Sequence, residues 1–154
     1  MTCALRARAN EIIHSHLCRA YPEEGCGVLL GRDQDATRTV ERAISFDNVH
    51  ADERERRYLI APEQFLAAEK EARDAGLDVV GFFHSHPDHP AAPSAFDLEH
   101  AWPFYTYLIV SVRNGAVADA KAWRLADDRS RFDPEELIAL EDGAAVAPPG
   151  EARR

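Results

Sequence analysis

The sequence predicts an α/β domain with a mixed β-sheet flanked by helices. Three observations lead to this fold class. Residues 4–19 carry apolar side chains at close to helical spacing. Residues 105–112 and 117–125 are two expected strands around the hairpin signal Arg113-Asn114-Gly115. A helical segment over residues 62–75 lies between two further apolar runs and suggests a crossover connection. Such a mixture of helices, hairpins and one crossover is typical of α/β domains.

The first part of the chain predicts a helix followed by a β-hairpin. The helix covers residues 4–19, and Tyr21-Pro22 ends it because the residue before a proline avoids helical geometry. Residues 26–30 are a short apolar run typical of a central strand. Residues 37–46 alternate between apolar and polar and are the expected hairpin partner.

The later elements follow in chain order. They are a charged loop over 47–58, a short strand over 58–60, a helix from Pro62 to a stop at Gly76, a buried strand over 79–84, a short helix over 94–101, the two strands of the second hairpin, and a last helical turn over 133–140. We expect a single domain over residues 1–138, followed by a disordered tail rich in proline and small residues over 139–154.

Composition excludes several classes of function. The 154 residues are 45% hydrophobic, enough for one core, and the net charge of −9 disfavours nucleic acid as a partner. No phosphate-binding glycine motif, secretory signal or apolar run long enough to span a membrane is present. An odd number of cysteines, none in a Cys-x-x-Cys pair, indicates a reduced, cytoplasmic protein.

Two histidines at the end of the strand over 79–84 indicate a metal site. Because side chains at i and i+2 share one face of a strand, His84 and His86 point their imidazoles at one place. Asp97 is the best candidate for a third ligand, since a helix that starts at Ser94 can return it toward the strand end. A catalytic zinc site has three protein ligands and one open position for water.

The same residues also fit simpler structural roles. A buried histidine is often only a core residue, and Ser94 with Asp97 has the form of a helix-capping pair, a role that is compatible with a place in the site. His89 is an alternative ligand whose direction the surrounding prolines make unpredictable. The remaining polar candidates, expected to be structural, exposed or behind the ligands, are His14, His16, His50, Asp88 and His100.

The spacing of this stretch resembles the JAMM motif of the MPN+ metalloproteases. His84-Ser85-His86-Pro87, six residues, and Ser94-Ala95-Phe96-Asp97 match a pattern with five fixed positions. The upstream sequence EGCGVLLG resembles the family's glutamate-bearing strand, and its Cys-Gly register selects Glu24 over the neighbouring Glu23. The resemblance covers residues 4 to about 125 and implies a single MPN (JAB) domain.

The resemblance implies a role for each motif residue. His84, His86 and Asp97 would hold one Zn²⁺ per chain. Glu24 would take a proton from the attacking water and pass it to the leaving amine, and Ser94 would hydrogen-bond the oxyanion. Ser85 is expected to face the other side of the strand, and Cys26 to be a buried strand residue rather than a nucleophile.

The resemblance also implies a substrate class. The chain looks like the small stand-alone prokaryotic members, which hydrolyse amide bonds at the C-terminal tail of ubiquitin-like, sulfur-carrier proteins. Arg54, Arg56 and Arg57 are candidates for contact with an acidic carrier, although a solvated charged loop is the commoner arrangement. The alternatives are a non-catalytic MPN-type module that binds protein and keeps zinc for structure, and an amidase of small molecules. The sequence makes no prediction about oligomeric state.

Overall fold

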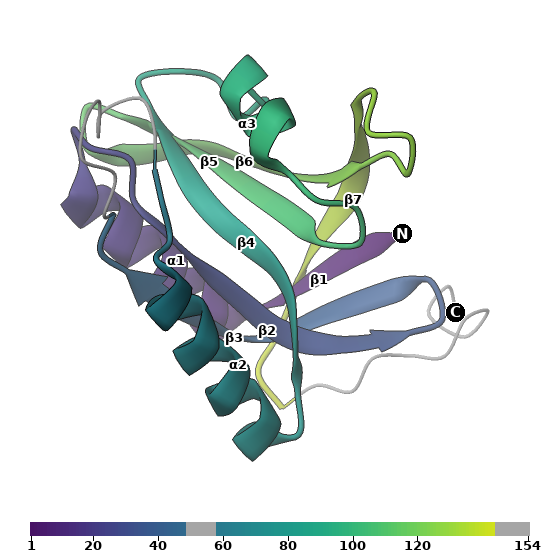
Figure 1. The fold of residues 1–154 in the computed structure, drawn as a ribbon. Coiled ribbons are helices and arrows are strands. Elements are labelled where there is room, and N and C mark those ends of the chain that lie inside the picture. Colours follow the sequence, from purple (N-terminus) through teal and green to yellow (C-terminus); the bar gives the residue numbers. More distant parts are fainter. Residues whose placement is uncertain (49–57, 144–154) are drawn as a thin grey trace.

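The structure, a computed structural model, describes residues 1–48 and 58–143 (Figure 1). This part of the chain forms seven strands and three helices. In chain order they are β1 (Thr2–Arg6), α1 (Ala7–Ala20), β2 (Cys26–Gln34), β3 (Thr37–Phe46), α2 (Pro62–Ala75), β4 (Asp78–Pro87), α3 (Ala95–His100), β5 (Thr106–Arg113), β6 (Ala116–Leu125) and β7 (Phe132–Leu140).

The strands close into a barrel in the order β1-β3-β2-β4-β5-β6-β7. The predicted fold class, a mixed sheet flanked by helices, is therefore wrong. Closure comes from β1, which pairs in parallel with β3 on one side and with β7 on the other. The two ends of the described chain thus meet in one sheet, with Thr2 opposite Glu136.

The sequence pattern predicts helix for most of both closing strands. Residues 2–6 are instead a strand in which Cys3, Ala4 and Leu5 are all buried, and the helix begins only at Ala7. The segment predicted as a last helical turn is β7, and it continues to Leu140. Local spacing could not reveal this pairing, because each strand is stabilised by a partner more than a hundred residues away. Most of the predicted tail, residues 144–154, lies outside the described residues.

Two further elements differ from the prediction. Residues 58–60 form no strand, and Tyr58 instead stacks on the ring of His84. The central strands β2 and β4 run further than predicted, and β2 continues past a register shift at Leu30/Gly31. None of the helices in the described part of the chain is long and apolar enough to cross a membrane.

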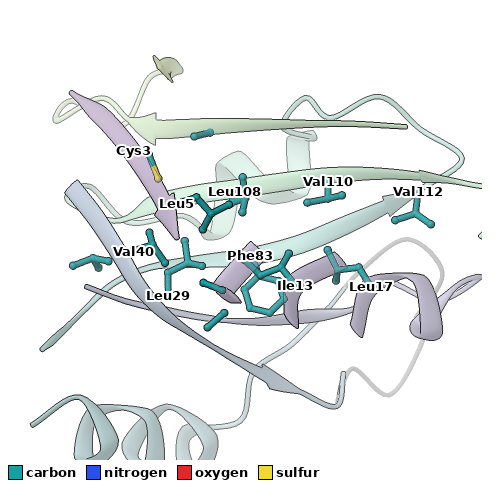
Figure 2. Packing of buried hydrophobic residues seen from close by; sticks show 14 residues of the cluster. Cys3, Leu5, Ile13, Leu17, Leu29, Val40, Phe83, Leu108, Val110 and Val112 are labelled. Atoms are coloured by element: carbon teal, nitrogen blue, oxygen red, sulfur yellow. The ribbon is translucent and has the colours of Figure 1, made fainter. Parts of the chain in front are cut away.

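The core lies on both faces of strands β2 and β4. On one face Leu29 and Phe83 pack against Ile13 and Leu17 of α1, as Figure 2 shows. On the other face a second cluster joins these strands to α2. Alternate residues of each strand thus meet different helices, as the two-residue period of a strand requires.

Strand pairing brings distant segments to the end of β4. Cys26 of β2 lies opposite His84 in antiparallel pairing, and Ile109 of β5 lies opposite it in parallel pairing. Gly81 allows β5 to approach closely, because a Cβ atom at this position would overlap the carbonyl of Thr106. The end of β4 that carries His84 and His86 is therefore held between β2 and β5.

Candidate metal centre

His84 and His86 present their imidazoles to one point at the end of β4. Their Nε2 atoms are 3.2 Å apart, and both residues are buried, with exposed fractions of 1% and 7%. The ordinary alternation of a strand accounts for their shared direction.

Asp97 completes a three-residue group. Its Oδ1 lies 3.2 Å from Nε2 of His84, and its Oδ2 lies 3.1 Å from Nε2 of His86. Ser94 caps α3, because its hydroxyl accepts from the Asp97 amide at 3.0 Å while Oδ2 of Asp97 accepts from the Ser94 amide at 2.8 Å. The capping pair and the convergence on the histidines therefore occur together.

Contacts behind the ligands orient the two rings. Nδ1 of His86 lies 2.9 Å from the carbonyl oxygen of Pro90, so it donates its proton there and leaves the Nε2 lone pair free. The ring of His84 stacks on Tyr58 at 4.5 Å between centroids. Its Nδ1 is buried and has no hydrogen-bond partner among the described residues.

The charges of the group suit a cation. Burial lowers the pKa of His84 despite the nearby carboxylate of Asp97. Burial also lowers the pKa of His86, but the hydrogen bond and charge of Asp97 outweigh it, so this pKa lies above its ordinary value. Burial opposes ionisation of Asp97, yet the two histidines hold its pKa well below the usual range. The site therefore offers a carboxylate and imidazole nitrogens together.

These observations fit a metal ion. One ligand atom from each of His84, His86 and Asp97 lies within 4.8 Å of the other two, and all three residues are buried. A divalent cation between two imidazoles and a carboxylate would compensate the negative charge of the buried carboxylate. The group can therefore hold a metal.

Glu24 lies beside this group, just before β2. Its neighbour Gly25 exchanges two hydrogen bonds with Ser85, one from the Gly25 amide to the hydroxyl at 2.9 Å and one from the Ser85 amide to the Gly25 carbonyl at 3.1 Å. Asn48 donates to the Glu24 carbonyl at 3.1 Å. Ser85, as predicted, points away from the histidines, and there it fixes the backbone that carries Glu24.

The Glu24 carboxyl is buried and holds its proton unusually tightly. Burial raises its pKa to about 8, with His86 opposing the rise and Asp97 adding to it. A carboxyl group that changes protonation near neutral pH is suited to transfer protons in both directions.

In the metal-free protein, Glu24 is expected to make stability fall as the pH rises. Its ordinary pKa is 4.5 and its folded pKa is about 8, so the folded state binds the extra proton between these values. This contribution is fully present below about pH 4.5 and is lost as the pH approaches 8. Glutamine does not titrate, so the Tm of Glu24→Gln relative to wild type should rise from pH 5 to pH 8 in thermal melts with a chelator.

The exposed neighbour Glu23 supplies the control for these melts. Glu23→Gln should follow the wild-type pH dependence. If Glu24→Gln showed the same pH dependence of Tm as wild type, the Glu24 carboxyl would not have a raised pKa in the folded protein.

Cys26 is fully buried, as predicted. Burial raises the pKa of its thiol to about 12, and the nearby Glu24 adds to the rise. A thiol that stays protonated is a poor nucleophile.

An aromatic cleft of about 750 Å³ opens beside the metal group. His84 and Asp97 are among the residues that line it. Residues 58–60 form part of its wall, and the loop 101–105 between α3 and β5 forms another part. Among the apolar side chains that line it, the following are half or more exposed: Leu59, Trp102 and Phe104.

The remaining predicted polar residues lie apart from the metal group. His89 is exposed, and the exposed Asp88 accepts from the hydroxyl of Tyr21 at 2.6 Å. His100 lines the cleft and stacks on Phe96. The predicted loop arginines Arg54, Arg56 and Arg57, together with His50, lie outside the described residues.

Sequence reasoning missed the cleft and its walls. The apolar pattern predicts a strand at Tyr58, and no spacing rule places this residue on His84. The run Trp102-Pro103-Phe104-Tyr105 is the one signal that was available, because three aromatic residues beside a short helix are uncommon in a purely solvated loop.

Comparison with known proteins identifies the family of the chain. Residues 6–126 match the family of prokaryotic homologues of the JAB domain. A desampylase from Haloferax volcanii is 44% identical over 113 residues, which are 70% of this chain and 79% of that protein. A probable TtuB-protein conjugate cleaving protease from Thermus thermophilus is 40% identical over 59% of this chain and 57% of that protein.

A solved structure shows the same architecture. The solution structure of a protein from Desulfitobacterium hafniense superimposes with a TM-score of 0.80 at 34% identity, over 92% of this chain and 94% of that one. A strand-rich barrel with a His-His-Asp group beside a buried glutamate defines a metallohydrolase of the JAMM type. With the match over residues 6–126, the chain belongs to the prokaryotic JAB family.

Proposed function

We propose that this protein is a zinc-dependent peptidase or isopeptidase that hydrolyses the amide bond at the C-terminal tail of a ubiquitin-like, sulfur-carrier type protein. The observation that carries the proposal is the convergence of His84, His86 and Asp97. His84 and Asp97 of this group line an aromatic cleft, and the buried Glu24 lies close enough for His86 and Asp97 to influence its pKa. Relatives named as a desampylase and as a conjugate-cleaving protease support the substrate class.

His84, His86 and Asp97 are proposed to hold one zinc ion per chain. When bound, zinc supplies Lewis-acid polarisation of the scissile carbonyl and of the attacking water. The hydrogen bond from His86 Nδ1 to the Pro90 carbonyl fixes the ring so that Nε2 is the coordinating atom. Asp97 is held in place by the Ser94 amide, which donates to one of its carboxylate oxygens.

Glu24 is proposed to move the proton. Its carboxylate accepts a proton from the attacking water and, once protonated, donates it to the leaving amine. Burial of this carboxyl raises its pKa, so its carboxylate form is a stronger base than an exposed glutamate. Ser94 is proposed to donate its hydroxyl proton to the developing oxyanion, since its oxygen already accepts from the Asp97 amide.

The cleft suits a polypeptide tail rather than a small polar amide. Its walls offer exposed apolar surface at Leu59, Trp102 and Phe104, which contact with a protein substrate would cover. The chain's cysteines Cys3, Cys18 and Cys26 are all free, which supports a reducing compartment, the cytoplasm, as the place of action.

Incubation of the zinc-loaded protein with carrier fusions tests the proposal. Ubiquitin-like carriers that bear a C-terminal extension after Gly-Gly, or an isopeptide-linked lysine, are expected to lose the extension as a defined mass difference by intact mass spectrometry. A short peptide with the same Gly-Gly sequence should be cleaved far more slowly. Equal rates on both would indicate an amidase of small substrates, and no cleavage of any fusion would contradict the proposal.

A further inference from the structure

Arg38, the second residue of β3, is fully buried. Its guanidinium makes a two-point ion pair with Asp33, with Nε 2.7 Å from Oδ1 and Nη2 2.9 Å from Oδ2. Burying a charge is unfavourable unless it is paired and hydrogen-bonded. The metal chemistry described above does not use this side chain, so its burial points to a different role.

The other side of the guanidinium reaches the wall of the cleft. Nη1 of Arg38 donates to the carbonyl oxygen of Phe104 at 2.6 Å and to that of Val80 at 2.9 Å. The guanidinium carbon also lies 4.5 Å from the centroid of the Phe104 ring. Arg38 therefore links β4 of the barrel to the loop 101–105.

Phe104 has an unusual backbone. Its φ is +84°, in the left-handed region that bulky residues avoid, and its side chain is half exposed. A bulky residue stays in this conformation only where surrounding contacts hold it. The hydrogen bond from Arg38 to its carbonyl is such a contact.

Two other hydrogen bonds hold the start of loop 101–105 in place. The Trp102 amide donates to the hydroxyl of Tyr107 at 2.9 Å, and Arg129 donates to the Ala101 carbonyl at 2.9 Å. The guanidinium of Arg129 also lies 4.8 Å from the centroid of the Trp102 ring. These contacts act at Ala101 and Trp102, whereas Arg38 acts at Phe104.

We propose that Arg38 is a positioning residue for substrate binding, which holds Phe104 in its left-handed conformation and thereby fixes the wall of the cleft formed by loop 101–105. Asp33 serves as the counter-ion that keeps the guanidinium in place. The proposal rests on the proposed function, because the cleft is taken as the place where the carrier tail binds. Arg38 touches neither the metal ligands nor Glu24.

Arg38→Met tests this role through two measurements. Hydrogen exchange of the amides of loop 101–105 is expected to become faster, and kcat/KM for a cleaved carrier fusion is expected to fall by about 10- to 100-fold, mainly through KM. Metal content should stay at the wild-type value. Trp102→Ala, which removes a side chain from the same wall, should raise KM in the same direction.

Arg124→Met is the matched control. Arg124 forms an ion pair with Glu135 at 3.0 Å, and Glu135 also accepts from Thr106, to which Arg38 donates at 3.2 Å. Arg124 therefore shares the buried network of Arg38, but its hydrogen bond goes to Glu135 and not to Phe104. Its removal should leave loop exchange and KM near their wild-type values. Should Arg38→Met fail to fold, Arg38→Lys replaces it, because lysine keeps the positive charge near Asp33 but cannot contact Asp33 at two points and Phe104 together.

A Phe104→Gly background separates positioning from general support of the barrel. Glycine adopts a φ of +84° at no steric cost, so Arg38→Met should raise KM less in this background than in the wild type. The proposal would be overturned if Arg38→Met raised KM by the same factor in both backgrounds. It would also be overturned if Arg38→Met and Arg124→Met changed KM and loop exchange equally. If the wild type cleaves no carrier, the exchange measurement still decides the role of Arg38, and the proposed function fails separately.

Discussion

Glu24→Gln is expected to lower turnover by about 10²- to 10⁴-fold while the protein keeps its metal. Glutamine has nearly the same shape as glutamate but neither accepts nor releases a proton at neutral pH. In the proposed mechanism the water would then lose its base and the leaving amine its acid. The metal ligands are other residues, so metal affinity should change little.

Single-turnover cleavage of a carrier fusion and metal analysis of the same sample measure the two effects together. Glu23→Gln is the control, because Glu23 is the adjacent residue and is exposed. Its rate should match wild type. A Glu24→Gln variant that cleaved at the wild-type rate would assign the base to another residue, and a wild type with bound zinc but no activity would favour the non-catalytic module.

His84→Ala is expected to abolish both metal binding and turnover. Changes to groups behind a metal ligand typically cost about 10- to 100-fold in affinity, so the loss of a ligand should exceed about 100-fold. The variant removes a ring that stacks on Tyr58 and contacts Asp97 at 3.2 Å, so the carboxylate also loses a partner.

Isothermal titration calorimetry with Zn²⁺ measures the metal affinity, and the cleavage assay on the same samples measures turnover. His89→Ala is the matched control, because His89 lies just after β4, is exposed and is outside the three-residue group. It should bind metal as wild type does. If His84→Ala bound zinc with unchanged affinity, the ion would have to lie elsewhere in the molecule.

Much of the candidate site was predictable because its residues are close in sequence. His84 and His86 share a strand face by simple alternation, and Asp97 returns to them through a helix start that Ser94 marks. Glu24 was different. It lies sixty residues upstream of the histidines, and its place depends on the pairing of β2 with β4, so only the family resemblance selected it.

The barrel was not predictable for a related physical reason. Leu5 fits a helical pattern and residues 133–140 contain good helix formers, so local preference favours helix at both places. Pairing between Leu5 and Ala139 overrides that preference, and no local pattern encodes it. The cleft walls were not predictable either. One of them is a loop whose shape depends on the hydrogen bond from Arg38 to the Phe104 carbonyl and on the hydrogen bond that the Tyr107 hydroxyl accepts from the Trp102 amide.

The closure of the barrel by β1 and β7 has a consequence for how the chain folds during synthesis. The strands that carry and support the metal group lie between Cys26 and Arg113. Strand β1, in contrast, cannot complete its pairing until β7 has been synthesised. Because Thr2 pairs with Glu136, the N-terminal strand keeps one unpaired edge until nearly the whole domain has been translated. Contacts of such long sequence separation are slow to form. A chaperone that shields an apolar strand edge would therefore find its target at β1 while the later strands are still being translated.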